Sequence, residues 1–169
     1  MIIGFAGRAG AGKTTAAMRL VDKYGYEIYS FAKPIKDLLC PFFGWDGRHA
    51  YGELKEEIDT QWGFSPRAAF QTFGTEFARA LNPDFWLIKA QQSIKNFNTA
   101  IDDIRFTNEA GWTRKRGILI HVIRPDAKDV RQHVSETPLE IHRNDLILQN
   151  NGTIEDLYQK LDGFLGCLS

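Results

Sequence analysis

The residues best suited to chemistry in this chain lie near its start, at positions 7–14. The sequence there is Gly-Arg-Ala-Gly-Ala-Gly-Lys-Thr, which fits the pattern G-x-x-x-x-G-K-[ST] at every fixed position. Glycines let backbone N–H groups turn towards phosphate oxygens, and a helix that begins here adds the positive end of its dipole. Lys13 can bridge the outer phosphates of a nucleotide, and the Thr14 hydroxyl can bind Mg²⁺.

This loop predicts ATP or GTP as a ligand, together with Mg²⁺. Taken alone, it does not choose between a kinase, a hydrolase and a switch. With ATP as the ligand, the residues expected to bind its phosphates are Arg8, Gly10, Ala11, Gly12, Lys13, Thr14 and Thr15.

A second candidate for chemistry is the acidic segment that begins at Asp102. In proteins with such a phosphate loop, an acid at the end of a nearby strand holds Mg²⁺ directly or through water. We favour Asp103 over Asp102 for this role, because Asp103 is paired with Arg105 in the segment 103–109, and we expect the metal site to comprise Thr14 and Asp103. A solvated loop start or a helix cap is the alternative reading of these acids.

Arginines recur in the regions where phosphates are expected. The planar guanidinium donates two parallel hydrogen bonds, which suits a phosphate group. Transfer between two phosphate esters gathers several negative charges, and cations must offset them. A phosphate acceptor is already largely ionised near neutral pH, so no general base is required. The arginines concerned are Arg8, Arg67, Arg79, Arg105, Arg124 and Arg131.

The elements that must position these residues follow from short apolar runs and helical periodicity. A helix is expected at 13–24, and another begins at Thr153, where Asp156 completes a capping box. Strands that alternate with helices predict a mostly parallel sheet covered on both faces. The five expected strands are 2–6, 26–30, 100–104, 117–123 and 146–149.

Two stretches do not fit this alternation, and we expect both to project from the sheet. Residues 31–98 are expected to be mostly helical, with breaks at Pro41, at 44–47 and at 63–66. Eleven aromatic residues fall within 42–86, and most of them are expected to pack a small core there. The other stretch is 124–144. Ligands of open α/β sheets bind at the carboxyl ends of strands, and both stretches leave from such ends.

Composition sets the remaining limits. The chain has 169 residues, is 43% hydrophobic and has a formal net charge of zero, which is typical of a folded domain. A neutral chain lacks the cationic excess of a general nucleic-acid binder. No apolar run is long enough to span a membrane, and Cys40 and Cys167 show no metal-binding spacing. We expect a cytoplasmic protein, in the host cytoplasm if the source is viral. His121 lies on an expected buried strand, so we expect it to have a structural role in the core.

Several segments, in this order along the chain, resemble the bacteriophage deoxynucleoside monophosphate kinases. This resemblance implies a P-loop kinase fold, a three-layer α/β/α arrangement with a five-stranded mostly parallel sheet. It also implies a core of 1–30, 99–123 and 145–169, a helical monophosphate-binding insertion at 31–98 and a lid at 124–144. The segments that carry it, with the phosphate loop, are 32–37, 67–76, 103–109, 122–125 with 133–136, and 145–147 with 150–153.

The resemblance implies transfer of the ATP γ-phosphoryl group to a deoxynucleoside 5′-monophosphate, with Mg²⁺. It assigns the catalytic cations to Lys13, Arg105, Arg124 and Arg131, and it places 151–153 beside the adenine of ATP. The residues implied for the monophosphate site are Lys36, Arg67, Gln71, Gly74, Thr75, Trp86, Asp103, Arg105 and Glu109.

Other readings stay open from the sequence. A dephospho-coenzyme A or phosphomevalonate kinase would share this fold, and a nucleotide-binding switch would share the phosphate loop. The expected partners are ATP and a deoxynucleoside monophosphate, without nucleic acid or membrane, and a homodimer is compatible with the sequence. The segment between Phe43 and Ser65 is short compared with larger members of the family, and no residue indicates which base is accepted.

Overall fold

The computed structural model describes residues 1–96, 98–127 and 137–167. It divides into two compact units, one formed by residues 1–29 and 93–169 and the other by residues 30–92. Within the described ranges, no helix is long and apolar enough to cross a membrane.

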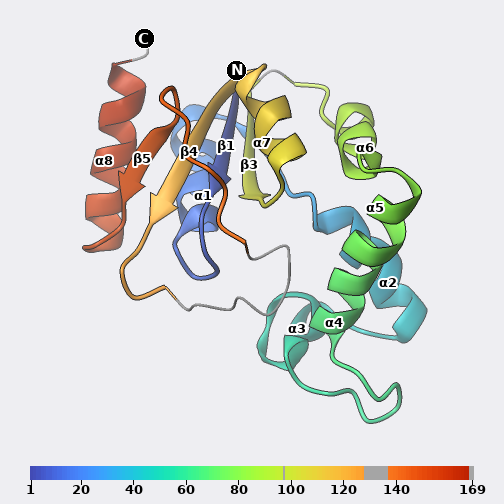
Figure 1. Ribbon diagram of the computed structural model, residues 1–169. Helices are drawn as coiled ribbons and strands as arrows, with labels where there is room; N and C mark the ends of the chain where they lie inside the picture. Colours follow the sequence, from blue (N-terminus) through green and yellow to red (C-terminus); the bar gives the residue numbers. More distant parts are fainter. Residues whose placement is uncertain (97, 128–136, 168–169) are drawn as a thin grey trace. The chain divides into compact units, whose positions relative to one another are not determined.

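The first unit is built on a five-stranded sheet (Figure 1). The strand order is β2-β3-β1-β4-β5, and every neighbouring pair is parallel. Each strand lies within two residues of its predicted position, and the sheet is fully parallel where the sequence predicted a mostly parallel one. The strands are β1 (Ile2–Ala6), β2 (Glu27–Tyr29), β3 (Thr99–Ile104), β4 (Gly117–Ile123) and β5 (Leu146–Gln149).

Three helices cover the two faces of this sheet. α1 (Lys13–Tyr24) and α8 (Ile154–Gly166) pack against each other, whereas α7 (Thr107–Arg114) packs against β1 and β4. A Cβ added at Gly4 of β1 would meet α7, at 2.8 Å from a methyl of Thr113. Neighbouring strand residues point to opposite faces, so α7 lies across the sheet from α1 and α8. The predicted three-layer arrangement is confirmed.

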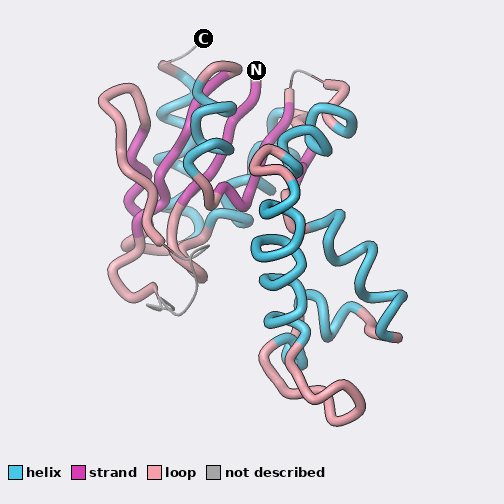
Figure 2. Tube along the Cα trace, turned by 45° about the vertical axis from the view of Figure 1, so that its right-hand side comes forward, coloured by secondary structure: helices cyan, strands magenta, loops and turns pink. Residues whose placement is uncertain are grey.

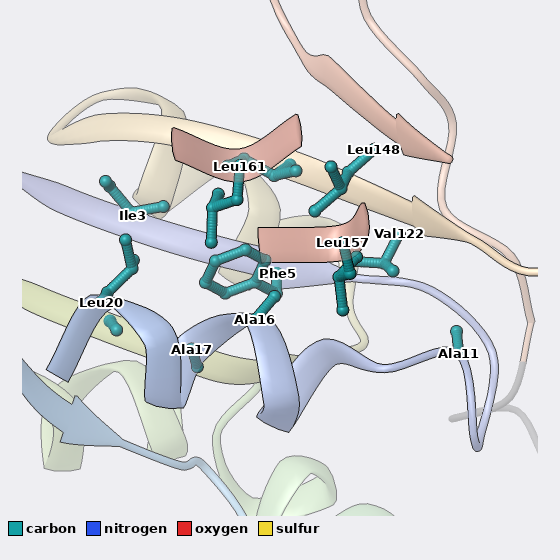
Figure 3. Packing of buried hydrophobic residues seen from close by; sticks show 12 residues of the cluster. Ile3, Phe5, Ala11, Ala16, Ala17, Leu20, Val122, Leu148, Leu157 and Leu161 are labelled. Atoms are coloured by element: carbon teal, nitrogen blue, oxygen red, sulfur yellow. The ribbon is translucent and has the colours of Figure 1, made fainter. Parts of the chain in front are cut away.

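The main core of this unit lies between the sheet and the α1–α8 layer. Phe5 of β1 is fully buried and lies beside Ala16 of α1 and Leu157 of α8 (Figure 3). Full burial of one such large side chain stabilises the fold by about 1.5–3 kcal/mol. Ala11 belongs to the same core, so the hydrophobic packing extends into the loop between β1 and α1.

The second unit is helical throughout its regular elements, as predicted for this stretch (Figure 2). An isolated antiparallel bridge joins Asp59 to Phe64 in its longest loop. Its elements are α2 (Lys33–Phe43), α3 (Gly47–Tyr51), the 3-10 turn η1 (Glu53–Lys55), α4 (Pro66–Gln71), the π-helical η2 (Thr72–Phe77), α5 (Ala78–Leu81) and α6 (Phe85–Ser93).

One predicted helix break is wrong. α2 continues through Pro41 and ends at Gly44, whose φ of 72° is left-handed. Proline already has a helical φ and costs one backbone hydrogen bond near a helix end, whereas leaving the helix needs the conformation that glycine adopts easily. The predicted break at 63–66 is confirmed, because Ser65 caps α4 and Pro66 begins it.

The predicted lid is only partly described. Residues 124–127 and 137–144 form no helix or strand. Arg131 and the segment 133–136, on which part of the resemblance rested, lie outside the described residues.

Candidate active site

The loop between β1 and α1 has the backbone that a phosphate-binding loop requires. Gly7, Gly10 and Gly12 all have positive φ, at 143°, 74° and 100°. A Cβ at Gly7 would lie 2.4 Å from the carbonyl oxygen of Val122, so the strand beside the loop leaves no room for a side chain there. The sequence motif therefore forms the expected strand–loop–helix unit.

Lys13 is the first residue of α1 and is 7% exposed. Its Nζ donates hydrogen bonds to the carbonyl oxygens of Gly7 at 2.9 Å and Arg8 at 2.8 Å. These contacts fold the ammonium group back over the glycine-rich loop. A positive charge held in this place is suited to the outer phosphates of a nucleotide.

The next residue, Thr14, is bonded to an acid on a neighbouring strand. Thr14 Oγ1 donates a 2.7 Å hydrogen bond to Oδ2 of Asp102, whose residue is 7% exposed. A hydroxyl and a carboxylate side by side are hard oxygen donors of the kind that Mg²⁺ prefers. These two residues fit a magnesium site at this point.

This geometry disagrees with our preference for Asp103 as the acid that accompanies Thr14. Neighbouring residues of β3 point to opposite faces of the sheet, and Asp102 shares the face of Ala100, which packs in the α1–α8 core. The charge of Asp103 instead affects the hydroxyl group of Tyr29. Burial first, and then the charges of Asp103 and Glu109, raise the pKa of the Tyr29 hydroxyl.

A pocket of about 530 Å³ opens over the phosphate loop. It brings together most of the residues predicted to bind ATP phosphates, and it adds the turn between β5 and α8. Ala11 differs, because its methyl group is buried in the core and only its backbone can take part. Its lining includes Gly10, Gly12, Lys13, Thr14, Thr15, Arg124, Asn150, Gly152 and Thr153.

A second cavity of about 370 Å³ lies at the carboxyl ends of β1, β3 and β4. Three of the predicted arginines line it: Arg8, Arg105 and Arg124. Its other side is partly apolar and includes Pro138 and Leu139 from the described end of the predicted lid. Several guanidinium groups around one cavity suit a ligand with more than one phosphate charge.

Glu109 has a different place from the one that the resemblance implied. The residue is 1% exposed, and its Oε2 accepts hydrogen bonds from the backbone N–H groups of Arg105 at 2.8 Å and Phe106 at 3.0 Å. A carboxylate that accepts backbone donors at a helix start is a capping interaction. In this structure Glu109 therefore supports the turn that carries Arg105.

Asp145 forms a buried ionic cluster behind the second cavity. Its side chain is 1% exposed and lies 2.9 Å from His121 Nε2, and Arg114 donates to both its oxygens at 2.8 and 2.7 Å. Burial alone would raise the pKa of Asp145, but hydrogen bonds from Arg114, the His142 backbone and His121 outweigh it and hold the pKa below its usual range. The predicted structural role of His121 is confirmed.

The remaining predicted acceptor residues belong to the second unit. Arg67 and Gln71 are four residues apart on α4, and Arg67 Nη1 pairs with Oε1 of Glu56. Lys36 Nζ lies 3.7 Å from the ring centroid of Tyr51. We had not predicted a role for Glu56, because an exposed acid in a loop carries no sequence signal of its partner.

The segment that contains Gly74 and Thr75 is a π-helical turn, a type of irregularity that is frequent at functional sites. Its geometry is supported by Trp86, which is 4% exposed and donates from Nε1 to the Gly74 carbonyl at 2.8 Å. A Cβ at Gly74 would lie 2.8 Å from Cδ1 of Ile35. Trp86 thus holds this turn through its indole N–H, and no local residue pattern predicts the π-helical turn.

Comparison with known proteins decides the family. The family model described as deoxynucleotide monophosphate kinase matches residues 47–161, which is more than half of the chain. The chain belongs to the deoxynucleotide monophosphate kinase family. It is therefore a kinase that acts on nucleotides, and the family inferred from the sequence motifs is confirmed.

Two viral relatives of this kinase agree with the assignment. A protein of Acanthamoeba polyphaga mimivirus, named as a predicted deoxynucleotide monophosphate kinase, is 34% identical over 95% of this chain and 94% of its own length. The deoxynucleotide monophosphate kinase of Enterobacteria phage T4 is 31% identical over 69% of this chain and 51% of its own length.

The fold of the kinase is also found in solved structures. Shikimate kinase from Aquifex aeolicus superposes with a TM-score of 0.52 at 13% identity, over 99% of this chain and 98% of that one. At this level of identity the likeness concerns the fold, and it confirms the P-loop kinase arrangement of sheet and helices.

Proposed function

We propose that this kinase transfers the γ-phosphoryl group of ATP to a deoxynucleoside 5′-monophosphate and so forms the diphosphate. The observation that carries the proposal is the position of Arg124, which lines both the pocket over the phosphate loop and the second cavity. A cation shared by two neighbouring cavities is what a transfer between two phosphate esters needs.

On the donor side, the loop backbone and Lys13 bind the β- and γ-phosphates of ATP. Lys13 is already buried and held by two loop carbonyls, so its side chain does not have to be ordered from solution when the nucleotide binds. The β5–α8 turn, through 151–153, contributes to the nucleoside side of this pocket. Gly152 and Thr153 line the pocket, which supports this part of the proposal.

Thr14 and Asp102 hold Mg²⁺ in this proposal, directly or through water. When bound, the ion supplies charge neutralisation between the phosphate oxygens. The chain's own contribution is to orient the hydroxyl of Thr14, since the hydrogen bond to Asp102 fixes the direction of this side chain.

On the acceptor side, the arginines of the second cavity offset the charge of the reacting phosphates. The second ionisation of a phosphate monoester has a pKa of about 6, so the attacking oxygen carries its negative charge at neutral pH without a base. Arg8 and Arg105 stabilise the charge that gathers during transfer, which is the main work of a protein in this type of reaction.

In this proposal, the acceptor nucleotide is recognised by Arg67, Gln71 and Lys36 of the second unit. Arg67 has the planar fork that a 5′-phosphate needs, and Gln71 follows one helical turn later on α4. Gly74 and Thr75 contribute backbone groups from the π-helical turn, whose regular hydrogen-bond pattern is shifted.

The test is ADP release in a coupled assay with Mg-ATP and separate dTMP, dGMP, dCMP, dAMP and ribonucleotide acceptors. Turnover on deoxynucleotides well above the rate without acceptor is expected, and Arg124→Ala should reduce kcat by about 10²–10³-fold. Arg143→Ala is the matched control, because Arg143 is exposed and lines neither cavity. ADP release at the no-acceptor rate with every nucleotide would contradict the proposal.

A further inference from the structure

Asn150 lies directly after β5 and reaches back to the phosphate loop across 139 residues of sequence. Its Nδ2 donates a 2.8 Å hydrogen bond to the carbonyl oxygen of Ala11, and the residue is 9% exposed. Its backbone N–H donates to the Ile123 carbonyl at 2.8 Å, at the end of β4. The residue is thus anchored to the sheet through its backbone and bonded to the loop through its side chain.

The contact is close as well as polar. A Cβ built on Gly12 would lie 2.5 Å from Asn150 Nδ2, so the amide group packs directly against the loop backbone at that point. Gly12 has a φ of 100°, a conformation that residues with side chains rarely adopt. Asn150 therefore occupies the space that the missing side chain of Gly12 leaves.

The turn that carries Asn150 is itself held in place. Lys160 of α8 donates from Nζ to the Gln149 carbonyl at 2.9 Å and to Asn151 Oδ1 at 2.8 Å. Thr153 caps α8 and accepts a hydrogen bond from the Asp156 N–H. The donor of the Asn150 hydrogen bond is consequently presented by a rigid turn and not by a free loop.

The hydrogen bond to Ala11 has a consequence for Gly12. The peptide unit between the two residues is planar and trans, so its C=O and N–H groups point in opposite directions. When the Ala11 carbonyl is held towards Asn150, the direction of the Gly12 N–H is fixed. A glycine-rich loop has little conformational preference of its own, so an outside contact is needed to select one orientation.

We infer that Asn150 is a positioning residue of the nucleotide site, which orients the Ala11–Gly12 peptide so that the loop is preorganised for the phosphates of ATP. The inference rests on the proposed nucleotide site and adds a residue to it. Preorganised N–H groups bind an anion more tightly because they need not be reoriented at the moment of binding.

Three substitutions separate the donated hydrogen bond from charge and from general structure. Asn150→Leu removes the donor without adding a charge, and Asn150→Asp keeps the size of the side chain but donates only when its carboxyl is protonated. Gln159→Glu is the matched control, because it makes the same amide-to-carboxylate change at an exposed position of α8 that lines neither cavity. ADP affinity is measured by calorimetry near pH 5 and pH 8, always as the ratio to wild type.

Asn150→Leu should weaken ADP binding about 10–100-fold at both pH values, the size expected for an unsatisfied buried carbonyl. Asn150→Asp should show a similar loss at the higher pH, where its carboxylate is ionised and cannot donate, whereas Gln159→Glu should bind as wild type does. Lys13 and Lys160 are common to all these proteins, so their effects cancel in the ratio. In turnover, the KM for ATP should rise while the KM for the acceptor stays within about twofold.

Wild-type affinity in Asn150→Leu would overturn the positioning role, and so would wild-type affinity in Asn150→Asp at the higher pH. A wild-type protein that fails to bind ADP would instead overturn the nucleotide site itself, so the two failures are distinguishable. Should the Asn150 variants not fold, the wild-type protein supplies the test by NMR. A hydrogen-bond scalar coupling between Asn150 Nδ2 and the Ala11 carbonyl carbon is expected with ADP bound, and its absence would overturn the inference.

Discussion

Thr14 and Asp102 lie 88 residues apart in the chain, and the hydroxyl of one donates a 2.7 Å hydrogen bond to the carboxylate of the other. The contact exists because β1 and β3 are neighbours in the sheet, with Gly4 opposite Ile101. The loop after β1 and the carboxyl end of β3 consequently share one edge of the sheet. This relationship assigns the Mg²⁺-associated acid of our proposal to Asp102.

Asp102→Asn should therefore be the more damaging of two adjacent substitutions. The amide cannot replace the charge of the carboxylate, so we expect kcat to fall about 10²–10³-fold and the Mg²⁺ concentration for half-maximal rate to rise. Asp103→Asn should change both quantities much less. Steady-state rates over a Mg²⁺ titration check this, and a larger loss in Asp103→Asn would return the role to Asp103.

Glu56 should compete with the acceptor phosphate for Arg67. Its side chain is 61% exposed and pairs with a guanidinium that we assign to the monophosphate. Because the Glu56 carboxylate is in water, the ion pair should contribute about 1 kcal/mol, and Glu56→Gln should lower the acceptor KM by up to about fivefold. Steady-state rates with dTMP as the varied acceptor measure this.

Replacing Arg67 should have the opposite effect and impair the use of the acceptor. Arg67→Ala should reduce kcat/KM for the acceptor about 10²-fold or more, because a charged hydrogen bond to the phosphate is removed. Arg48→Ala is the control, since Arg48 is an exposed arginine of the same unit that pairs with Asp46. A raised acceptor KM in Glu56→Gln would show that Glu56 orients Arg67 and does not compete for it.

Glu109→Ala should lower stability and activity together. It leaves the N–H groups of Arg105 and Phe106 without their buried acceptor, which we expect to cost about 1–3 kcal/mol of unfolding free energy. Urea unfolding measures this loss. Glu155→Ala, at an exposed position in the first turn of α8, should change stability by less than about 0.5 kcal/mol. Equal losses in the two variants would contradict the role of Glu109 as a cap.

The Asp145 carboxylate should make the free energy of unfolding depend on pH in the acidic range. Its pKa is held below the usual range in the folded state, whereas an unfolded aspartate has a pKa of about 3.9. The stabilisation is therefore complete above about pH 4 and is lost as the pH falls below that value towards the folded pKa. Unfolding free energies between pH 2.5 and 7 should show this fall in the wild type.

Asp145→Asn provides the comparison. At pH 7 it should cost about 3 kcal/mol, because Arg114 and His121 lose a nearly buried charged partner. Below pH 4 the difference between the variant and wild type should shrink, because the Asp145 carboxyl is then protonated in the unfolded wild type while the folded protein still holds it ionised, which lowers the wild-type free energy of unfolding. A difference that stays constant over the whole range would show that titration of Asp145 does not contribute.

Much of the architecture could be predicted because its signals are local. The strand at 117–123 and the capped helix after Thr153 are encoded by runs of apolar residues and by capping residues within a few positions. The phosphate loop is likewise encoded by adjacent glycines, Lys13 and Thr14. The break expected at Pro41 is wrong, because proline fits the last turn of a helix and the helix ends only where Gly44 adopts a left-handed conformation.

Side-chain partners across the fold could not be predicted in this way. Whether Asp102 or Asp103 meets Thr14 depends on strand register, because a shift of one residue turns every side chain to the other face of the sheet. The hydrogen bond from Asn150 to Ala11 depends on distant segments in the same manner. The sequence by itself determined the nucleotide-binding motif, the strands and the family resemblance, since neighbouring residues carry that information. Only the tertiary structure decided which acid meets Thr14 and which amide holds the phosphate loop, because packing brings these groups together across the chain.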